Sequence, residues 1–243
     1  MAIVRRARPL LGTLVEIGVR ASAGTEADRA VAVAFARIAA VQSHLSRFDP
    51  RSDIGRFNAA PAKVSLAIHA DTVSVLAAAA TLRDASGGVF DVTLGSGASS
   101  WRVDAGRLVK LADGVRIDLG GIGKGFAVDC AVDALGACGV EAGWVNAGGD
   151  LRAFGDLAVP IVLRDERRGG ASAFATIEDG AFATSRRRDP RGPWRHASVA
   201  APTCLWADAL TKIVVASGDP GAALLARFGA FAWLHGDEER AAA

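Results

Sequence analysis

The chain has 243 residues, of which 51% are hydrophobic, so it can bury the core of one large domain or of two small lobes. Its 28 lysines and arginines against 26 aspartates and glutamates give a formal charge of only +2, without a basic arm interleaved with aromatic residues, which argues against a nucleic-acid partner. Cys130, Cys138 and Cys204 lack the spacing of a zinc or redox motif, so they suit a reducing compartment and, as small side chains, a protein core.

The N-terminal segment predicts a half-buried strand. Arg5, Arg6 and Arg8 precede an apolar run, as they would in a secretory signal, but Glu16 interrupts that run. The segment has a period of two, carried by Leu11, Thr13, Val15, Ile17 and Val19. No window approaches ~18 uncharged apolar residues, so we expect no membrane span. A cytoplasmic protein follows, or a periplasmic one if a leader has been removed.

Residues 25–47 predict a long amphipathic helix, because apolar side chains recur at helical spacing after Thr25, the expected N-cap. A polar connection over 49–62 leads to an alanine-rich helix near 70–85, which the glycines at 87 and 88 close. Residues 87–97 then predict a turn and a short strand.

The second half of the chain predicts helices alternating with clustered strands. A helix over 125–138 ends at Gly139. A helix near 204–217 and a final helix–strand pair close the chain. This order, without internal repeats, predicts one α+β domain over residues 1–243 with mixed layers of helix and β-sheet. Short strands are expected around 142–146, 151–154, 158–164, 172–178 and 196–201.

A glycine-rich turn over residues 116–125, RIDLGGIGKG, directly precedes the predicted helix. Gly120, Gly121, Gly123 and Gly125 would let backbone approach a ligand closely, and the N-terminus of the helix would offer N–H groups to an anion such as phosphate. Lys124 adds a positive charge, and the acidic residue at 118 could bind a ribose hydroxyl or an adenine amine. The turn lacks the spacing of a Walker or dinucleotide motif, so a plain tight turn is the alternative.

A second turn of small residues, WVNAGGDLRAFG over 144–155, follows a predicted strand. Gly148 and Gly149 again favour close approach of backbone to a ligand, and the side chain of Asn146 or Asp150 could hydrogen-bond it. A simple hairpin turn explains the same residues.

Eight motifs occur in order along almost the whole chain: RPLLGTLVEI, LSRFDPRSDIGRFN, GGVFDVTLG, IDLGGIGKGFAVD, WVNAGGDLRAFG, ATS, DPRGP and SVAAPTCLWADALTKIVVASG. In this order they resemble the ApbE family of FAD:protein FMN transferases. The resemblance implies an ApbE-like fold that uses FAD, usually with Mg²⁺. It also implies transfer of FMN to a threonine hydroxyl of an acceptor flavoprotein, with release of AMP.

The resemblance also implies site residues. Phe48 would stack on a ring of the FAD, the alternative being ordinary packing at a helix end. Ser52 matches a polar position of the family, as do Asp53 and Asn58, and a helix-capping cluster is their alternative. Lys124, Asp208 and Lys212 are the expected catalytic residues. The expected FAD-binding residues are Phe48, Ser52, Asp118, Gly120, Gly121, Ile122, Lys124, Asn146, Gly148, Gly149, Asp150 and Thr184.

The chain departs from the family at the expected metal site. That site would combine a carbonyl at Gly121 with Asp208 and a threonine four residues later, but position 212 is a lysine and Thr211 comes one place early. Residues i and i+4 share a helix face, so the ammonium of Lys212 would point at Asp208 and repel Mg²⁺. The two alternatives are a plain ion pair and a lysine that replaces the charge of the metal beside the FAD diphosphate.

A second departure lies at SRRRDPRGP, residues 185–193, where the family carries a longer hairpin and a histidine before the Asp-Pro. Arg186, Arg187 and Arg188 predict a solvated loop, although they could bind phosphate or an acidic partner. His196 follows the Asp-Pro turn, and we expect it to be an ordinary strand residue without a catalytic role. Two further functions therefore stay open: hydrolysis of FAD to FMN and AMP, and flavin binding without catalysis.

Overall fold

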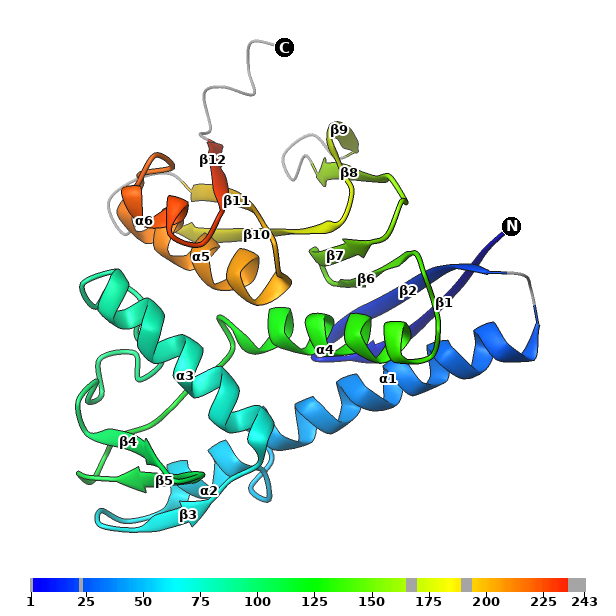
Figure 1. The fold of residues 1–243 in the computed structure, drawn as a ribbon. Coiled ribbons are helices and arrows are strands. Elements are labelled where there is room, and N and C mark those ends of the chain that lie inside the picture. The colour runs from blue at the N-terminus through cyan, green and yellow to red at the C-terminus, as the bar shows by residue number, and fades with distance from the viewer. Residues whose placement is uncertain (1, 22–23, 165–169, 189–193, 236–243) are drawn as a thin grey trace.

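A computed structural model of the chain describes residues 2–21, 24–164, 170–188 and 194–235 (Figure 1). Its centre is a seven-stranded antiparallel sheet of order β1-β2-β6-β7-β10-β11-β12. The two strands at the N-terminus form a hairpin, and the second pairs with β6. The strands are β1 (Ala2–Leu10), β2 (Thr13–Ala21), β6 (Gly143–Ala147), β7 (Asp150–Phe154), β10 (Gly180–Arg188), β11 (Trp194–Ala201) and β12 (Phe231–His235).

Three long helices pack against this sheet and bury the main core. Helix α4 (Gly123–Ala137) lies on β6 and β7 and is covered in turn by α1 (Thr25–Leu45). Helix α5 (Cys204–Ser217) lies on β10 and β11, and the short α6 (Ala223–Ala226) precedes β12. The core includes the fully buried side chains of Phe35, Ile38, Leu135 and Leu210.

A ribbon of two strands, β8 (Val159–Arg164) and β9 (Ala171–Ile177), forms a second, smaller core with the sheet. This core gathers side chains from β7, β8 and β10: Leu151, Ala153, Val159, Ile161 and Phe182.

Residues between α1 and α4 form a separate layer beside α1 (Figure 1). It contains α2 (Asp53–Ala59), β3 (Ser65–Ala67), α3 (Ala70–Ala85), β4 (Trp101–Asp104) and β5 (Arg107–Lys110), with the strands in the order β3-β5-β4. The Asn58 side chain ties this layer to the glycine-rich turn, because it accepts from the Ile117 N–H (2.7 Å) and donates to the Ile117 carbonyl (2.9 Å).

The structure confirms the α+β class and most of the predicted helices and strands. Several predictions were wrong. Residues 87–97 form turns without a strand, and Gly24 is the N-cap of α1 while Thr25 is its first residue. Helix α2 and strands β3, β4 and β5 lie where connections were expected, and Cys138 is exposed, whereas Cys130 and Cys204 are buried.

The predicted arginine loop was also wrong. Strand β10 continues through residues 186–188 because β11 pairs with it over its whole length, from Ala181 opposite Ala201 to Arg188 opposite Trp194. The ladder of backbone hydrogen bonds to β11 outweighs the local preference of a charge run for a loop. Residues 189–193, which include the Asp-Pro turn, lie outside the described residues.

No helix in the part of the chain that the structure describes is both long enough and apolar enough to cross a membrane.

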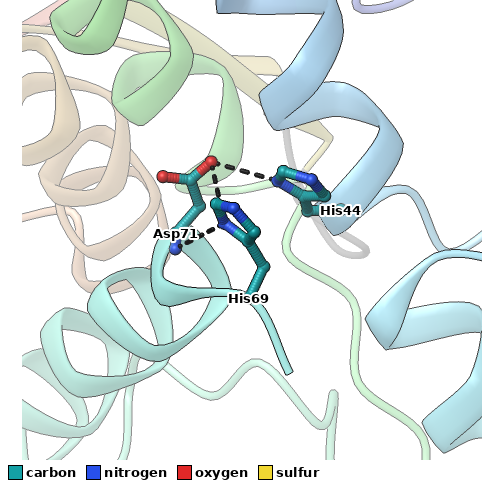
Figure 2. Close-up of side chains that lie close together, drawn as sticks. All are labelled: His44, His69 and Asp71. Atoms are coloured by element: carbon teal, nitrogen blue, oxygen red, sulfur yellow. Dashed lines mark hydrogen bonds and ion pairs between the residues drawn. The ribbon is translucent and has the colours of Figure 1, made fainter. Parts of the chain in front are cut away.

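An ion-paired cluster joins α1 to α3 (Figure 2). The Arg37 guanidinium donates two hydrogen bonds to the Asp71 carboxylate, at 2.7 and 2.5 Å. His44 Nδ1 lies 3.1 Å from the same carboxylate, and the rings of His44 and His69 stack with their centroids 3.7 Å apart. His69 is the N-cap of α3, since its Nδ1 accepts from the Asp71 N–H at 3.1 Å.

Two histidines and an aspartate are residue types that bind transition metals, but this arrangement does not fit such a site. Both Asp71 oxygens accept from Arg37, and His69 Nδ1 already accepts a backbone hydrogen bond. The imidazole planes are 19° apart, so a cation could not lie in both ring planes at bonding distance. The cluster therefore fixes the orientation of α3 on α1.

We expect Asp71→Asn to lower the free energy of unfolding by about 2–3 kcal/mol at pH 7, since it weakens charged hydrogen bonds to a mostly buried group. The hydrogen bonds from Arg37 hold the pKa of Asp71 below its ordinary value. Its contribution is thus complete above ~pH 4 and is lost as the pH falls through the folded-state pKa. Urea unfolding at several pH values measures this, with the exposed Asp84→Asn on the same helix as control. If Asp71→Asn lowers the free energy of unfolding as much in acid as at pH 7, the ionised Asp71 carboxylate is not the source of the stabilisation.

Candidate functional site

Helices α4 and α5 cross at Gly125, where the backbone of α4 lies close to the backbone of α5 at Cys204. A Cβ added to Gly125 would lie 2.2 Å from the Cys204 carbonyl oxygen, so no other residue fits without movement of a helix. The Gly125 N–H donates to the carboxylate of Asp208, which is completely buried, at 3.1 Å. Asp129 fixes the start of α5, because its carboxylate accepts from the N–H groups of Cys204 (2.9 Å) and Leu205 (2.8 Å).

The Lys212 ammonium sits one helical turn from Asp208 and has three oxygen acceptors. Its Nζ donates to Asp208 Oδ1 (2.7 Å), to Ser185 Oγ (2.6 Å) and to Thr211 Oγ1 (3.0 Å). The Thr211 hydroxyl is fully buried and donates its own proton to the Asp208 carbonyl at 2.6 Å. All three N–H donors of the ammonium are therefore matched with acceptors.

These residues do not fit a bound Mg²⁺. The oxygens of Asp208 and Thr211 that the sequence assigns to the metal already accept from Lys212. The stem of the lysine also packs on the third expected ligand, since a Cβ on Gly121 would lie 3.4 Å from Lys212 Cγ. A divalent cation among these oxygens would face an ammonium a few ångströms away, at a repulsion of roughly 4 kcal/mol or more for a partly buried pair of charges at ~4 Å. The Lys212 ammonium therefore lies where the sequence analysis expected the metal ion.

A second ion pair, between Lys124 and Asp150, lies beside the first. Burial and the negative charge of Asp208 raise the pKa of Asp150 to about 6, against the opposing charges of Lys124 and Lys212. Burial lowers the pKa of Lys124, but Asp208 and Asp150 outweigh it and the net pKa is raised. Asp150 is therefore protonated more readily than an ordinary aspartate, and its protonation in acid would weaken the pairing with Lys124.

The central sheet opens next to these ion pairs. Strands β7 and β10 pair only from Ala153 opposite Gly180 to Leu151 opposite Phe182. Beyond this point β10 continues with β11 alone, while β7 ends at the β6–β7 turn. The opening lies between that turn and Ser185, the residue that binds Lys212.

A cavity of about 710 Å³ occupies this opening, a volume within the usual range of ligand sites, roughly 300–1,000 Å³. Leu151, Ile161, Leu163 and Phe182 form much of its apolar wall. Its polar wall contains Asn146, Thr184, Ser185, Arg186, His196 and His235.

The turn between β6 and β7 forms one rim of the cavity. Gly148 and Gly149 have φ values of 64° and 104°, as a tight two-residue hairpin turn requires. The Asn146 side chain closes the turn, since it accepts from the Gly149 N–H at 2.9 Å. The hairpin alternative is thus confirmed, and the same turn also faces the cavity.

The glycine-rich turn presents Asp118 near an exposed aromatic ring. The Asp118 carboxylate accepts from the Gly120 N–H (2.8 Å) and pairs with Arg47 Nε (3.1 Å). The Arg47 guanidinium lies 4.3 Å from the centroid of the Phe48 ring, which is 80% exposed. Ordinary core packing is therefore the wrong explanation for Phe48.

The remaining predicted residues are used by the fold. Ser52 caps α2, since its Oγ accepts from the Gly55 N–H at 2.8 Å, and the Asp53 carboxylate accepts from the His69 N–H and the Thr72 hydroxyl, both at 2.7 Å. The Ile122 side chain is fully buried, so only its backbone could contact a ligand. The capping alternative is confirmed for Ser52, whose contact with FAD stays a prediction.

Sequence reasoning missed Ser185, Ser198 and His235, placed Arg186 in a solvated loop that could bind phosphate or an acidic partner, and gave His196 no role in the site. Four of these side chains line the cavity, and the fifth, Ser198, is buried behind it. The alternation of Phe182, Thr184 and Arg186 on β10 was an available signal, but it has meaning only once β10 is known to be a strand.

Comparison with known proteins gives consistent results. A sequence model of the ApbE family matches residues 11–108 and 97–233. The fold is similar to the flavin transferase ApbE from Vibrio cholerae, at 20% identity and a TM-score of 0.84 over 96% of this chain and 93% of that chain. No match was found among curated proteins.

Two further solved structures share the fold. The Pseudomonas stutzeri flavinyl transferase ApbE is 23% identical, with a TM-score of 0.79 over 96% of this chain and 90% of that chain. The ApbE protein of Thermotoga maritima is 22% identical, with a TM-score of 0.81 over 99% of this chain and 98% of that chain.

We expect the unmodified protein to show no Mg²⁺ binding by calorimetry at millimolar concentration, because Lys212 occupies the oxygens. Lys212→Thr should create a site, since it removes the ammonium and adds an oxygen beside Asp208. Thermal unfolding gives a second measurement: Mg²⁺ should stabilise Lys212→Thr and leave the unmodified protein and the exposed Lys63→Gln control unchanged. Tight Mg²⁺ binding by the unmodified protein would refute the exclusion.

Proposed function

Because the chain belongs to the ApbE family, we propose that it is a flavin transferase, which binds FAD and moves the FMN half to a threonine hydroxyl of an acceptor flavoprotein, releasing AMP. The observation that carries the proposal is a continuous row of groups suited to a dinucleotide. It runs from the exposed Phe48 ring past Asp118 and Gly121 to Lys212, and through Ser185 into the cavity.

Each part of FAD has a counterpart along this row. One ring system fits the apolar wall of the cavity, and the other would stack near Phe48. The Asp118 carboxylate is a hydrogen-bond acceptor for a ribose hydroxyl or an adenine amine. The diphosphate between the two ring systems would then lie at the Lys212 ammonium, which pairs with Asp208. The Lys124 ammonium, which pairs with Asp150, lies in the neighbouring ion pair.

The two lysines supply the charge that the reaction requires. Attack of a threonine hydroxyl on the FMN phosphorus forms a new P–O bond, and the bond to the AMP oxygen breaks, so negative charge grows on the leaving phosphate. Lys212 can donate to a phosphate oxygen in place of Ser185, and Lys124 can do so when Asp150 releases it. A lysine is a point charge and cannot bridge two phosphates as a metal does, so we expect slower transfer than with a divalent cation.

The decisive test is incubation with FAD and a flavoprotein domain that carries an acceptor threonine, with and without Mg²⁺. We expect equal amounts of AMP and acceptor-bound FMN, little changed by Mg²⁺, and none of the bound FMN with a threonine-to-alanine acceptor. Lys124→Met should slow the reaction, and Lys63→Gln should not. AMP with only free FMN would indicate a hydrolase, and FAD binding without AMP a non-catalytic flavin protein.

We expect Gly121→Val to weaken FAD binding at least tenfold in a fluorescence titration, with little change in melting temperature. Its φ lies outside the left-handed region, and an added Cβ would have the flexible stem of Lys212 and the Phe90 ring as its nearest neighbours, at 3.4 Å or more. Gly136→Ala, which meets nothing within 4 Å on α4, is the matched control. Gly149→Val is less informative, because its φ of 104° strains any side chain and stability should fall with it. If Gly121→Val lowers the melting temperature together with the affinity for FAD, the glycine is needed for the turn itself and not for contact with the ligand.

A further inference from the structure

Three polar side chains are joined by hydrogen bonds on the cavity face of the sheet. Thr184 on β10 lies directly opposite Ser198 on β11, and their hydroxyl oxygens are 3.1 Å apart. His235 on β12 places its Nε2 3.0 Å from the same Ser198 oxygen. Ser198 is fully buried, whereas Thr184 and His235 line the cavity. A chain of hydrogen bonds therefore runs from a cavity hydroxyl, behind the cavity wall, to an imidazole.

The hydroxyls can carry a proton in one direction along this chain. Ser198 has one proton and can accept another hydrogen bond, so with His235 in the tautomer that leaves Nε2 unprotonated it can donate to Nε2 while it accepts from Thr184. The imidazole at the end takes up protons near neutral pH, which neither hydroxyl does. A base that forms hydrogen bonds to a hydroxyl through fixed partners is the arrangement that activates oxygen nucleophiles.

Three other charged or titratable side chains line the cavity near this chain of hydrogen bonds: Glu16, Arg186 and His196. Glu16 on β2 pairs with Arg5 and accepts from the Trp144 indole N–H at 3.3 Å. Arg186 on β10 lines the same cavity. His196 on β11 is the cross-strand neighbour of His235, and the Phe174 ring of β9 meets His235 edge-on at 5.4 Å.

The strand that carries Thr184 also carries the contact with the ammonium. Thr184 is followed by Ser185, whose hydroxyl accepts from Lys212 at 2.6 Å. Successive side chains of a strand point to opposite faces, so Ser185 faces α5 and Thr184 faces the cavity at the same opening of the sheet. A diphosphate bound to Lys212 at this opening would lie beside the Thr184 hydroxyl.

We propose that Thr184, Ser198 and His235 form a proton relay that takes up the proton of the hydroxyl attacking the FMN phosphorus, an inference that rests on the proposed function. As the P–O bond to the acceptor threonine forms, its proton passes to Thr184 Oγ1. The Thr184 proton passes to Ser198, and the Ser198 proton to His235 Nε2. AMP leaves with the electron pair of the broken P–O bond, and the imidazolium then loses its proton to water. Thr184 is the catalytic residue, and Ser198 and His235 act through it.

The test compares His235→Asn, Ser198→Ala and the double variant in the transfer assay over a range of pH. Removal of a general base typically costs about 10²- to 10⁴-fold in rate. We expect each single variant to be as slow as the double variant, since they break one relay, with FAD affinity unchanged within about threefold. The rate of the unmodified protein should fall in acid as the histidine becomes protonated, and this fall should be absent in His235→Asn. Thr184→Ser should keep the relay and Thr184→Val should lose it.

Matched controls separate the relay from a structural role. Ser172→Ala on the exposed part of β9 should leave rate and pH profile unchanged, and His196→Asn should keep the fall in acid. If His196→Asn removes that fall, or if His235→Asn and Ser198→Ala transfer at the normal rate, the relay is refuted and the proposed function stands. If the unmodified protein releases no AMP from FAD in the presence of an acceptor, the proposed function fails and the relay with it. Thermal unfolding identifies any variant that is misfolded. If His235→Asn is misfolded, His235→Gln replaces it in the assay.

Discussion

The close contact of α4 with α5 at Gly125 is the constraint on which the candidate site depends. A side chain at this position would collide with the Cys204 carbonyl oxygen, so only glycine lets the backbone of α4 reach the buried Asp208 carboxylate. This contact brings the Lys124–Asp150 pair of α4 and β7 next to the Asp208–Lys212 pair of α5. Four charges from three separate elements, α4, β7 and α5, thereby share one partly buried region, where their interactions are stronger than in water.

The incomplete pairing of β7 with β10 is the second feature that shapes the site. A continuous sheet would separate the helix-covered face from the face under the β8–β9 ribbon. Because the two strands part beyond Phe182, the ammonium of Lys212 on one face and the cavity on the other are joined through Ser185. Strand β10 thus contributes to both parts of the site, because its alternating side chains place Ser185 at Lys212 and Thr184 at the cavity.

The sequence was informative where signals are local. Helix α5 has the predicted bounds, and the spacing of Asp208 and Lys212 on it places their charges together as expected. Strand β10 could not be found in this way, because a run of arginines favours a loop and only pairing with β11 makes it a strand. The hydrogen bonds of Ser198 depend on the pairing of β11 with its neighbour β10 and with β12, which lies further along the chain. Ser52, in a motif of the family, has the local capping role that was the alternative, while its contact with FAD stays a prediction. Asp53 in the same motif accepts hydrogen bonds from His69 and Thr72.

The proposed replacement of a bound metal ion by the Lys212 ammonium would change which solution conditions affect the site. A cation attached to the chain is held at Asp208 at an effective concentration that the solution cannot change, and neither chelators nor nucleotides that sequester free Mg²⁺ can remove it. It also cannot depart with a phosphorylated product, as a metal ion can. The positive charge at Asp208 would therefore not vary with the concentration of free metal ions, whereas acidity, through Asp150 and through the proposed relay at His235, would still affect the site.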